Sequence, residues 1–162
     1  IHLESQENFG TTITFTIPFE YNEETTKKYI ENIDVDTTSA SNYNILVVED
    51  NKINQLVTRK IIEKHNFKCA VVDDGYTALE ILKTETFDLI LMDINMPIIN
   101  GFETTRMIRE KGITVPIVAL TAFDKDEISD EAKLSGMNDV LIKPFEPVRL
   151  FQVISAQIAK SK

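Results

Sequence analysis

Three kinds of feature are scarce in this sequence of 162 residues, and each scarcity excludes a class of protein. Cys69 is the only cysteine, so no intrachain disulfide can form, and a reducing, cytoplasmic location is expected. No apolar run has the length of a membrane-spanning helix, and no signal peptide is recognisable. Basic residues number 17 against 26 acidic ones, a net charge of −9, which argues against a nucleic-acid-binding surface.

Composition and periodicity divide the chain into three segments. Residues 1–20 contain "TTITFTI", in which threonine alternates with isoleucine or phenylalanine as in a β-strand over 10–19. Residues 21–43 are polar and acidic and are interpreted as a linker. Residues 44–162 are interpreted as one globular domain. Because the chain begins without Met, we expect it to be a fragment of a longer protein.

The third segment alternates short apolar runs with helical periodicity. The runs predict strands over 43–50, 68–74, 87–93, 114–122 and 139–143. The intervening and final stretches predict helices over 51–65, from Gly75, from Gly101 to about Lys111, over 124–135 and from Pro147. This alternation predicts a doubly wound α/β domain, a five-stranded parallel sheet covered by helices on both faces. Right-handed crossovers would place the carboxyl ends of all five strands along one edge.

Chemically active side chains collect at that predicted edge. They are Glu49, Asp50, Asp93, Thr121 and Lys143. Clustered carboxylates repel one another unless a cation neutralises them, and Mg²⁺ suits a site made only of oxygen ligands. The hydroxyl and the ammonium would donate to phosphoryl oxygens, as in sites of phosphoryl transfer. Asp93 is therefore the candidate nucleophile and a metal ligand.

Each of these residues also has a simpler interpretation. An acid at a strand end often only faces solvent, Lys143 could be a loop lysine, and the Thr121 hydroxyl could bond the backbone. Five such coincidences at one edge are much less frequent than one, so the five residues together indicate a functional site more strongly than any one of them does. His65, in the polar stretch "EKHNF", is interpreted as a surface histidine.

Four ordered motifs carry a family resemblance. "ILVVEDN", "LILMDINMPIINGFE", "IVALTA" and "LIKPFEP" together resemble the receiver domain of two-component response regulators, over about residues 44–159. The resemblance implies a flavodoxin-like (βα)5 fold and a phosphoryl group accepted from a phosphohistidine. It implies that Asp93 is the phospho-acceptor and that Mg²⁺ is held by Glu49, Asp50, Asp93 and the backbone carbonyl of Asn95. It also implies that Lys143 and Thr121 bind the phosphoryl group and that the Lys143–Pro144 peptide bond is cis.

The first segment carries a second, shorter resemblance. "LESQENFGTTITFTIPF" looks like the last strands of a histidine-kinase ATP-binding domain, left here as an isolated strand or hairpin. With the receiver it implies a hybrid sensor histidine kinase, whose parent chain could be anchored in a membrane. None of the nucleotide-binding boxes is present, so we expect no ATP binding and only phosphorylation of Asp93 by a donor. Cut from its parent sheet, the strand could pair with a second copy to form a homodimer, or fold against the receiver.

Two residues depart from the family pattern. Val140 stands where the family usually carries Tyr or Phe, the aromatic that moves with the Thr121 hydroxyl when the domain switches. Phe123, two residues after Thr121, would border the path of the attacking water together with Asn95. Because an apolar ring does not orient water, we predict slow loss of the phosphoryl group.

The resemblance also implies partners. The donor would be a histidine kinase dimerisation domain or a histidine phosphotransfer protein, docked beside the helix over 51–65 near Ile53, Asn54 and Leu56. No contact of this fragment with nucleic acid or membrane is expected. Two alternatives stay open: a degenerate receiver that only docks partners, and an aspartate phosphatase of the haloacid-dehalogenase type. The phosphatase motif needs a second acid where this chain has Asn95.

Overall fold

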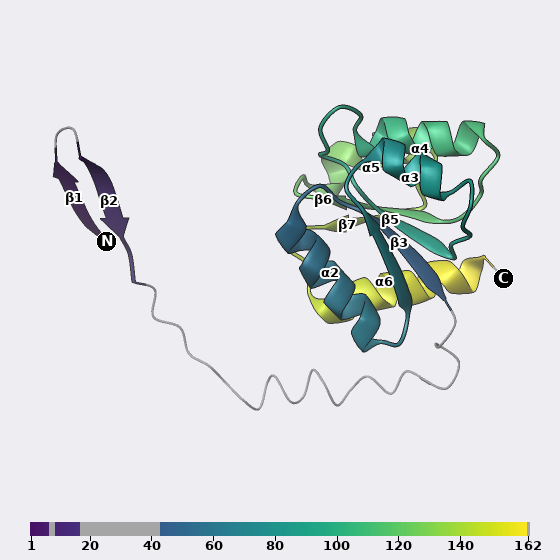
Figure 1. Ribbon diagram of the computed structural model, residues 1–162, viewed down its shortest axis with the longest axis horizontal. Coiled ribbons are helices and arrows are strands. Elements are labelled where there is room, and N and C mark those ends of the chain that lie inside the picture. The colour runs from purple at the N-terminus through teal and green to yellow at the C-terminus, as the bar shows by residue number, and fades with distance from the viewer. Residues whose placement is uncertain (7–8, 17–42, 162) are drawn as a thin grey trace. The chain divides into compact units, whose positions relative to one another are not determined.

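The computed structural model describes residues 1–6, 9–16 and 43–161, which belong to two separate units (Figure 1). The first unit contains an antiparallel hairpin of β1 (His2–Gln6) and β2 (Gly10–Thr14). The second contains a parallel sheet and its helices. The predicted linker lies outside the described residues except for Tyr43.

The hairpin is one of the two forms, strand or hairpin, expected of this segment, although alternation by itself predicted only the strand β2. β2 ends at Thr14, earlier than expected, and one of its edges pairs with β1. Leu3 lies opposite Ile13 and both side chains are exposed, as are all the others in the two strands. The sequence pattern did not predict β1, because HLESQ contains one apolar residue and so shows no alternation of apolar and polar residues.

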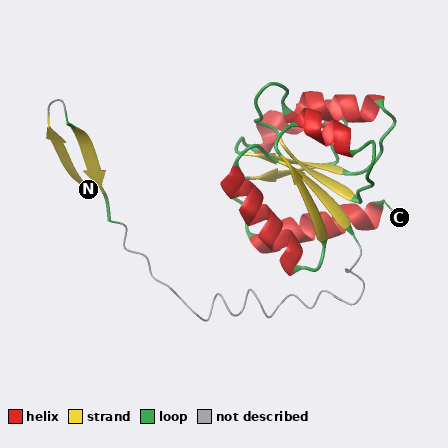
Figure 2. Ribbon diagram, viewed as in Figure 1, coloured by secondary structure: helices red, strands yellow, loops and turns green. Residues whose placement is uncertain are grey.

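The second unit confirms the predicted doubly wound fold. Its strands are β3 (Asn44–Val48), β4 (Lys68–Val72), β5 (Leu89–Asp93), β6 (Ile117–Thr121) and β7 (Asp139–Ile142). All are parallel to their neighbours in the order β4-β3-β5-β6-β7. The sheet runs through the middle of this unit, with helices on either side (Figure 2). The strand order is that of flavodoxin-like folds, which place their sites at the carboxyl ends of the central strands.

Among the described residues, five helices cover the sheet at the predicted places. They are α2 (Lys52–Lys64), α3 (Gly75–Ile81), α4 (Gly101–Glu110), α5 (Lys125–Ser135) and α6 (Pro147–Lys160). α2 and α6 pack on one face, and α3, α4 and α5 on the other (Figure 1). Within the described part of the chain, every helix is too short or too polar to cross a membrane.

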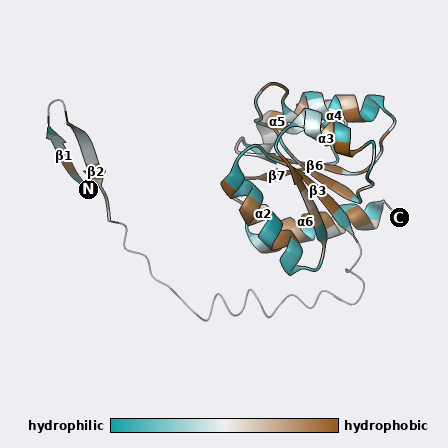
Figure 3. Cartoon of the chain, in the orientation of Figure 1, coloured by the Kyte–Doolittle hydropathy of each residue, from teal (hydrophilic) through white to brown (hydrophobic). Residues whose placement is uncertain are grey.

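The central strands are apolar on both sides. Leu46, Ile90, Met92 and Ala119 have no exposed surface, and the strands form the hydrophobic centre of the domain (Figure 3). Continuous apolar runs are expected where helices cover both faces of a parallel sheet. The polar residues at the strand ends therefore mark the point where each strand leaves the core.

Two helix starts fix the loops around that edge. The Asn51 side chain caps α2 by accepting hydrogen bonds from the backbone N–H groups of Ile53 and Asn54, at 2.9 and 3.3 Å. Asn100 and Glu103 form a reciprocal capping box at the start of α4. Gly101 lies so close to β5 that a Cβ built on it would be 2.3 Å from the carbonyl oxygen of Asp93. Only glycine fits there.

Candidate functional site

Three carboxylates meet at the carboxyl edge of the sheet. Glu49 and Asp50 follow β3, and Asp93 is the last residue of the neighbouring β5. One oxygen from each lies within 4.8 Å of the others. Glu49 and Asp93 are buried whereas Asp50 is exposed. An all-oxygen donor set that is open on one side fits a partly hydrated Mg²⁺ ion, so the residues chosen from the sequence are brought together as expected.

Lys143 lies between the two buried carboxylates. It follows β7, and its Nζ is 2.5 Å from Glu49 Oε2 and 2.9 Å from Asp93 Oδ2. Two buried carboxylates whose oxygens lie within 4.8 Å of each other would repel strongly. The Lys143 ammonium between them supplies the positive charge that stabilises both in the fold. The Lys143–Pro144 peptide bond is cis, as the resemblance implied.

The surroundings of Asp93 act on its pKa in opposite directions. Burial raises the pKa, the hydrogen bond and charge of Lys143 lower it, and the nearby Glu49 carboxylate raises it. The backbone N–H of Asn95 donates to Asp93 Oδ1 at 3.1 Å and also lowers it. Burial is the largest of these influences, so the pKa of Asp93 lies above its ordinary value. The ionised form therefore depends on the cations that surround it.

The Thr121 hydroxyl lies at the same edge. Thr121 is the last residue of β6, which pairs with β5, and it is fully buried. Its Oγ1 accepts a hydrogen bond of 3.0 Å from the backbone N–H of Phe123, and its carbonyl oxygen accepts from the backbone N–H of Lys143. The bond from Lys143 joins the ends of β6 and β7 beside the carboxylates, and the bond from Phe123 holds the hydroxyl within the loop after β6.

The first turn of α2 contributes contacts that sequence reasoning missed. Asn54 Nδ2 donates to Glu49 Oε1 at 2.9 Å, and the backbone N–H of Asn51 makes a longer bond of 3.4 Å to the same atom. Gln55 Nε2 lies 2.6 Å from both the carbonyl oxygen of Glu49 and Asp73 Oδ1. The available signal was the position of these amides, on the helical turn directly after the acidic pair.

The outer side of α2 carries an apolar stripe. Ile53, Leu56 and Val57 are 73%, 54% and 50% exposed, and their spacing places them on one side of the helix. Two of them were predicted to contact a donor, and their exposure is compatible with that. Asn54, the third predicted contact residue, directs its amide to Glu49.

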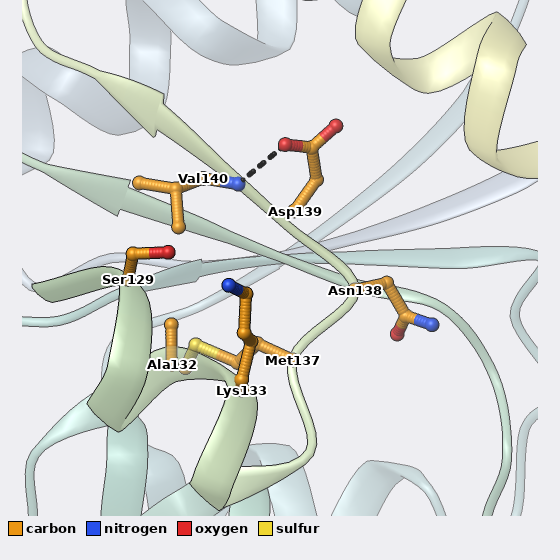
Figure 4. Close-up of a pocket in the computed structure, with 7 residues that line it drawn as sticks. All are labelled: Ser129, Ala132, Lys133, Met137, Asn138, Asp139 and Val140. Carbon is orange, nitrogen blue, oxygen red and sulfur yellow. Dashed lines mark hydrogen bonds between the residues drawn. The ribbon is translucent and has the colours of Figure 1, made fainter. Parts of the chain in front are cut away.

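A small pocket lies beside Val140 on the opposite side of the sheet from α2. Its volume is about 130 Å³, and it is lined by Ser129, Ala132, Lys133, Met137, Asn138, Asp139 and Val140 (Figure 4). The pocket opens where α5 meets β7. The Val140 side chain is nearly buried and short, so it leaves this space beside itself.

Known proteins resemble this domain in sequence and in fold. The family model described as the response regulator receiver domain matches residues 45–155. The chain belongs to the response regulator receiver family. Its receiver resembles a solved receiver domain of a sensor histidine kinase from Pseudomonas aeruginosa, which has a magnesium ion coordinated in its active-site cleft. The two are 36% identical, with a TM-score of 0.67 over 73% of this chain and 98% of that one.

Several longer relatives are sensor kinases, and another is the transcription factor SKN7 of Candida albicans, 33% identical over 130 residues. The sensor histidine kinase GacS of Pseudomonas protegens is 38% identical over 124 residues, which are 74% of this chain and 14% of that protein. The autoinducer 2 sensor kinase/phosphatase LuxQ of Vibrio vulnificus is 34% identical over 151 residues, 93% of this chain and 18% of that protein. The chain thus spans less than a fifth of either kinase.

Proposed function

We propose that this receiver takes a phosphoryl group from a phosphohistidine onto the Asp93 carboxylate and so relays a signal in a phosphorelay. The observation that carries the proposal is the position of Lys143, whose ammonium lies 2.9 Å from Asp93 beside two further carboxylates. A cation and a hydroxyl grouped around a strand-end carboxylate are the parts that phosphoryl transfer requires.

The transfer needs little from the protein beyond positioning. An oxygen of Asp93 attacks phosphorus as the phosphorus–nitrogen bond breaks, and the imidazole nitrogen keeps the bonding pair and takes a proton from solvent. The product is an acyl phosphate on Asp93. Lys143 and Thr121 would bind the phosphoryl oxygens, and the new charge would draw the Thr121 hydroxyl inward. Together with Val140, that movement would shift the surface of α5, β7 and α6 between two states.

The metal ligands of the proposal are Glu49, Asp50, Asp93 and the backbone carbonyl of Asn95. A bound Mg²⁺ would neutralise carboxylate and phosphoryl charge as the two approach. The oxygen donor set and the magnesium in the related Pseudomonas receiver support this choice of metal.

The donor would be a histidine domain of a kinase or a histidine phosphotransfer protein. The apolar stripe of α2 is exposed close to the acidic residues and suits such docking. Ile53 and Leu56 are predicted to contact the donor, and the exposed Val57 would extend that contact surface.

We also propose that the chain is the cytoplasmic part of a hybrid sensor kinase, whose parent chain could be anchored in a membrane, with the hairpin as the end of an ATP-binding domain. The alignment with LuxQ covers 151 residues and therefore reaches into the segment before Asn44. In the parent protein that domain would cover the exposed Leu3 and Ile13 face. Cut from it, the hairpin would pair with a second copy, and sedimentation of the fragment as a monomer would contradict this.

Phe123 is proposed to lengthen the life of the acyl phosphate. Its side chain is about half exposed just after Thr121 and offers no group that could orient a water molecule. The variant Phe123→Asn should lose the phosphoryl group faster than the wild type, measured by intact mass over time. Equal lifetimes would contradict the proposed role.

The function is tested by intact mass after incubation with Mg²⁺ and acetyl phosphate, with Asp93→Asn as the control. We expect one added phosphoryl group on the wild type and none on the variant. An adduct on both would place the acceptor elsewhere. If neither acetyl phosphate nor a phosphorylated kinase fragment gives an adduct while Mg²⁺ still binds, the receiver only docks partners.

A further inference from the structure

Both carboxylate oxygens of Glu49 are occupied by side chains from different parts of the fold. Oε1 accepts from Asn54 Nδ2 at 2.9 Å, and Oε2 accepts from Lys143 Nζ at 2.5 Å. Glu49 is 1% exposed, so water does not replace a lost partner easily. The orientation of this carboxylate is therefore set mainly by these two side-chain donors, one neutral and one charged, beside the longer bond of 3.4 Å from the backbone N–H of Asn51.

The two side-chain amides in the first turn of α2 donate to different parts of Glu49. Gln55 bonds its backbone carbonyl, 2.6 Å away, while Asn54 bonds its carboxylate. Asn54 is itself fixed, because its backbone N–H donates to the capping side chain of Asn51 at 3.3 Å. The amide of Asn54 thus comes from a helix end with little freedom to follow a carboxylate that moves.

We infer that Asn54 is a positioning residue for the magnesium site and acts through Glu49. The inference rests on the metal site proposed above. With Asn54 in place, Glu49 cannot rotate its carboxylate fully toward Lys143, and one oxygen stays anchored on the α2 side. Without Asn54, Lys143 is the only side chain holding that carboxylate, which then turns with the lysine toward Asp93 and leaves the arrangement in which the three carboxylates converge.

The expected loss of Mg²⁺ affinity can be judged from hydrogen bonds that orient metal ligands in other proteins. Loss of a hydrogen bond that orients a metal-site residue commonly weakens metal binding by about 10–100-fold. Because Glu49 keeps Lys143 and the weak bond from the Asn51 backbone, we expect the lower end, about a tenfold rise in the Kd for Mg²⁺ in Asn54→Ala.

The matched control removes a comparable amide elsewhere. Gln157 Nε2, on α6, donates to Asp139 Oδ2 at 2.9 Å and is likewise an amide–carboxylate bond between a helix and a strand. Isothermal titration with Mg²⁺ should give a Kd raised about tenfold for Asn54→Ala and unchanged within about twofold for Gln157→Ala, with urea unfolding of each variant measured beside it. Equal shifts in both variants, or none in Asn54→Ala, would overturn the inference.

A second measurement separates positioning from general damage. The rate of phosphorylation by acetyl phosphate, followed against Mg²⁺ concentration, should reach the wild-type maximum in Asn54→Ala but only at about tenfold higher Mg²⁺. A lower maximum with an unchanged half-saturating concentration would contradict the role assigned to Asn54. If the wild type itself shows no Mg²⁺ binding, the proposed metal site fails, which is a different result.

Discussion

Replacement of Gly101 by alanine tests whether the start of α4 and the acceptor strand are packed as closely as the geometry requires. The added Cβ would lie 2.3 Å from the Asp93 carbonyl oxygen and 3.0 Å from the Asp93 carbonyl carbon and Ile94 Cα, all backbone atoms. Ordinary contact begins at 3.4 Å, so the helix and the strand end must separate by roughly an ångström. Overpacking of this kind costs about 1–3 kcal/mol, more than the gain of up to about 1 kcal/mol from the better helix propensity of alanine.

The displaced group belongs to the acceptor residue, so activity should fall together with stability. We expect Gly101→Ala to lose about 2 kcal/mol of unfolding free energy in urea. Its phosphorylation by acetyl phosphate should slow by about tenfold or more, because misplacement by an ångström can cost a hundredfold.

Gly112→Ala is the control for the Gly101 experiment. Gly112 has φ +76° and no atom within 4 Å of a built Cβ, so alanine there should cost about 1 kcal/mol in backbone strain. It lies beyond the other end of α4 and should leave the phosphorylation rate unchanged. A Gly101→Ala protein with wild-type stability and rate would refute the packing argument.

Three further predictions concern residues away from the acidic edge. Burial raises the pKa of the Cys69 thiol from 9.0 to about 11, so iodoacetamide near pH 8 should alkylate it about a hundredfold more slowly in the folded protein than in urea. Burial, and to a smaller extent the charge of Lys64, lowers the pKa of His65. The stability that the neutral imidazole contributes is therefore present above about pH 6.5 and lost as the pH falls below that. The variant His65→Phe should lose less unfolding free energy than the wild type between pH 7.5 and 5.5, measured in urea. Val140→Phe should cost under about 1 kcal/mol in urea unfolding, because the adjacent pocket of about 130 Å³ is close to the roughly 150 Å³ that holds benzene in another protein; a loss of several kcal/mol would contradict this.

The fold could be predicted because its strands are apolar along their whole length. Runs such as Ile45–Val48 and Leu89–Met92 are buried on both faces, and only a covered parallel sheet explains several of them in alternation with helices. The first and last residues of each strand were predicted less closely, since an apolar run can extend beyond the last residue that pairs in the sheet. The run over 114–122 contains a strand only from Ile117, because Pro116 has no N–H to donate.

The acidic edge could be predicted for a related reason, while its supporting contacts could not. Parallel topology brings Asp93 beside Glu49 whatever their rotamers, so strand ends suffice to find them. The bond from Asn54 depends on a rotamer and on the angle at which α2 leaves the strand. His65 shows the same limit: its sequence neighbours are polar, yet its ring stacks on Phe151 at a centroid distance of 4.1 Å. Its interpretation as a surface histidine was incomplete.

The charges of the site explain how a cluster of acids with two buried members is compatible with a stable fold. Three carboxylates and the Lys143 ammonium leave two negative charges uncompensated, which equals the charge of one divalent cation. Burial of Glu49 and Asp93 makes their share of that imbalance costly, as the raised pKa of Asp93 indicates. The same imbalance favours any ligand that brings positive charge to the exposed side near Asp50. Phosphorylation then adds negative charge at Asp93, and Lys143, already shared between Glu49 and Asp93, is the cation that can shift toward it without leaving the site.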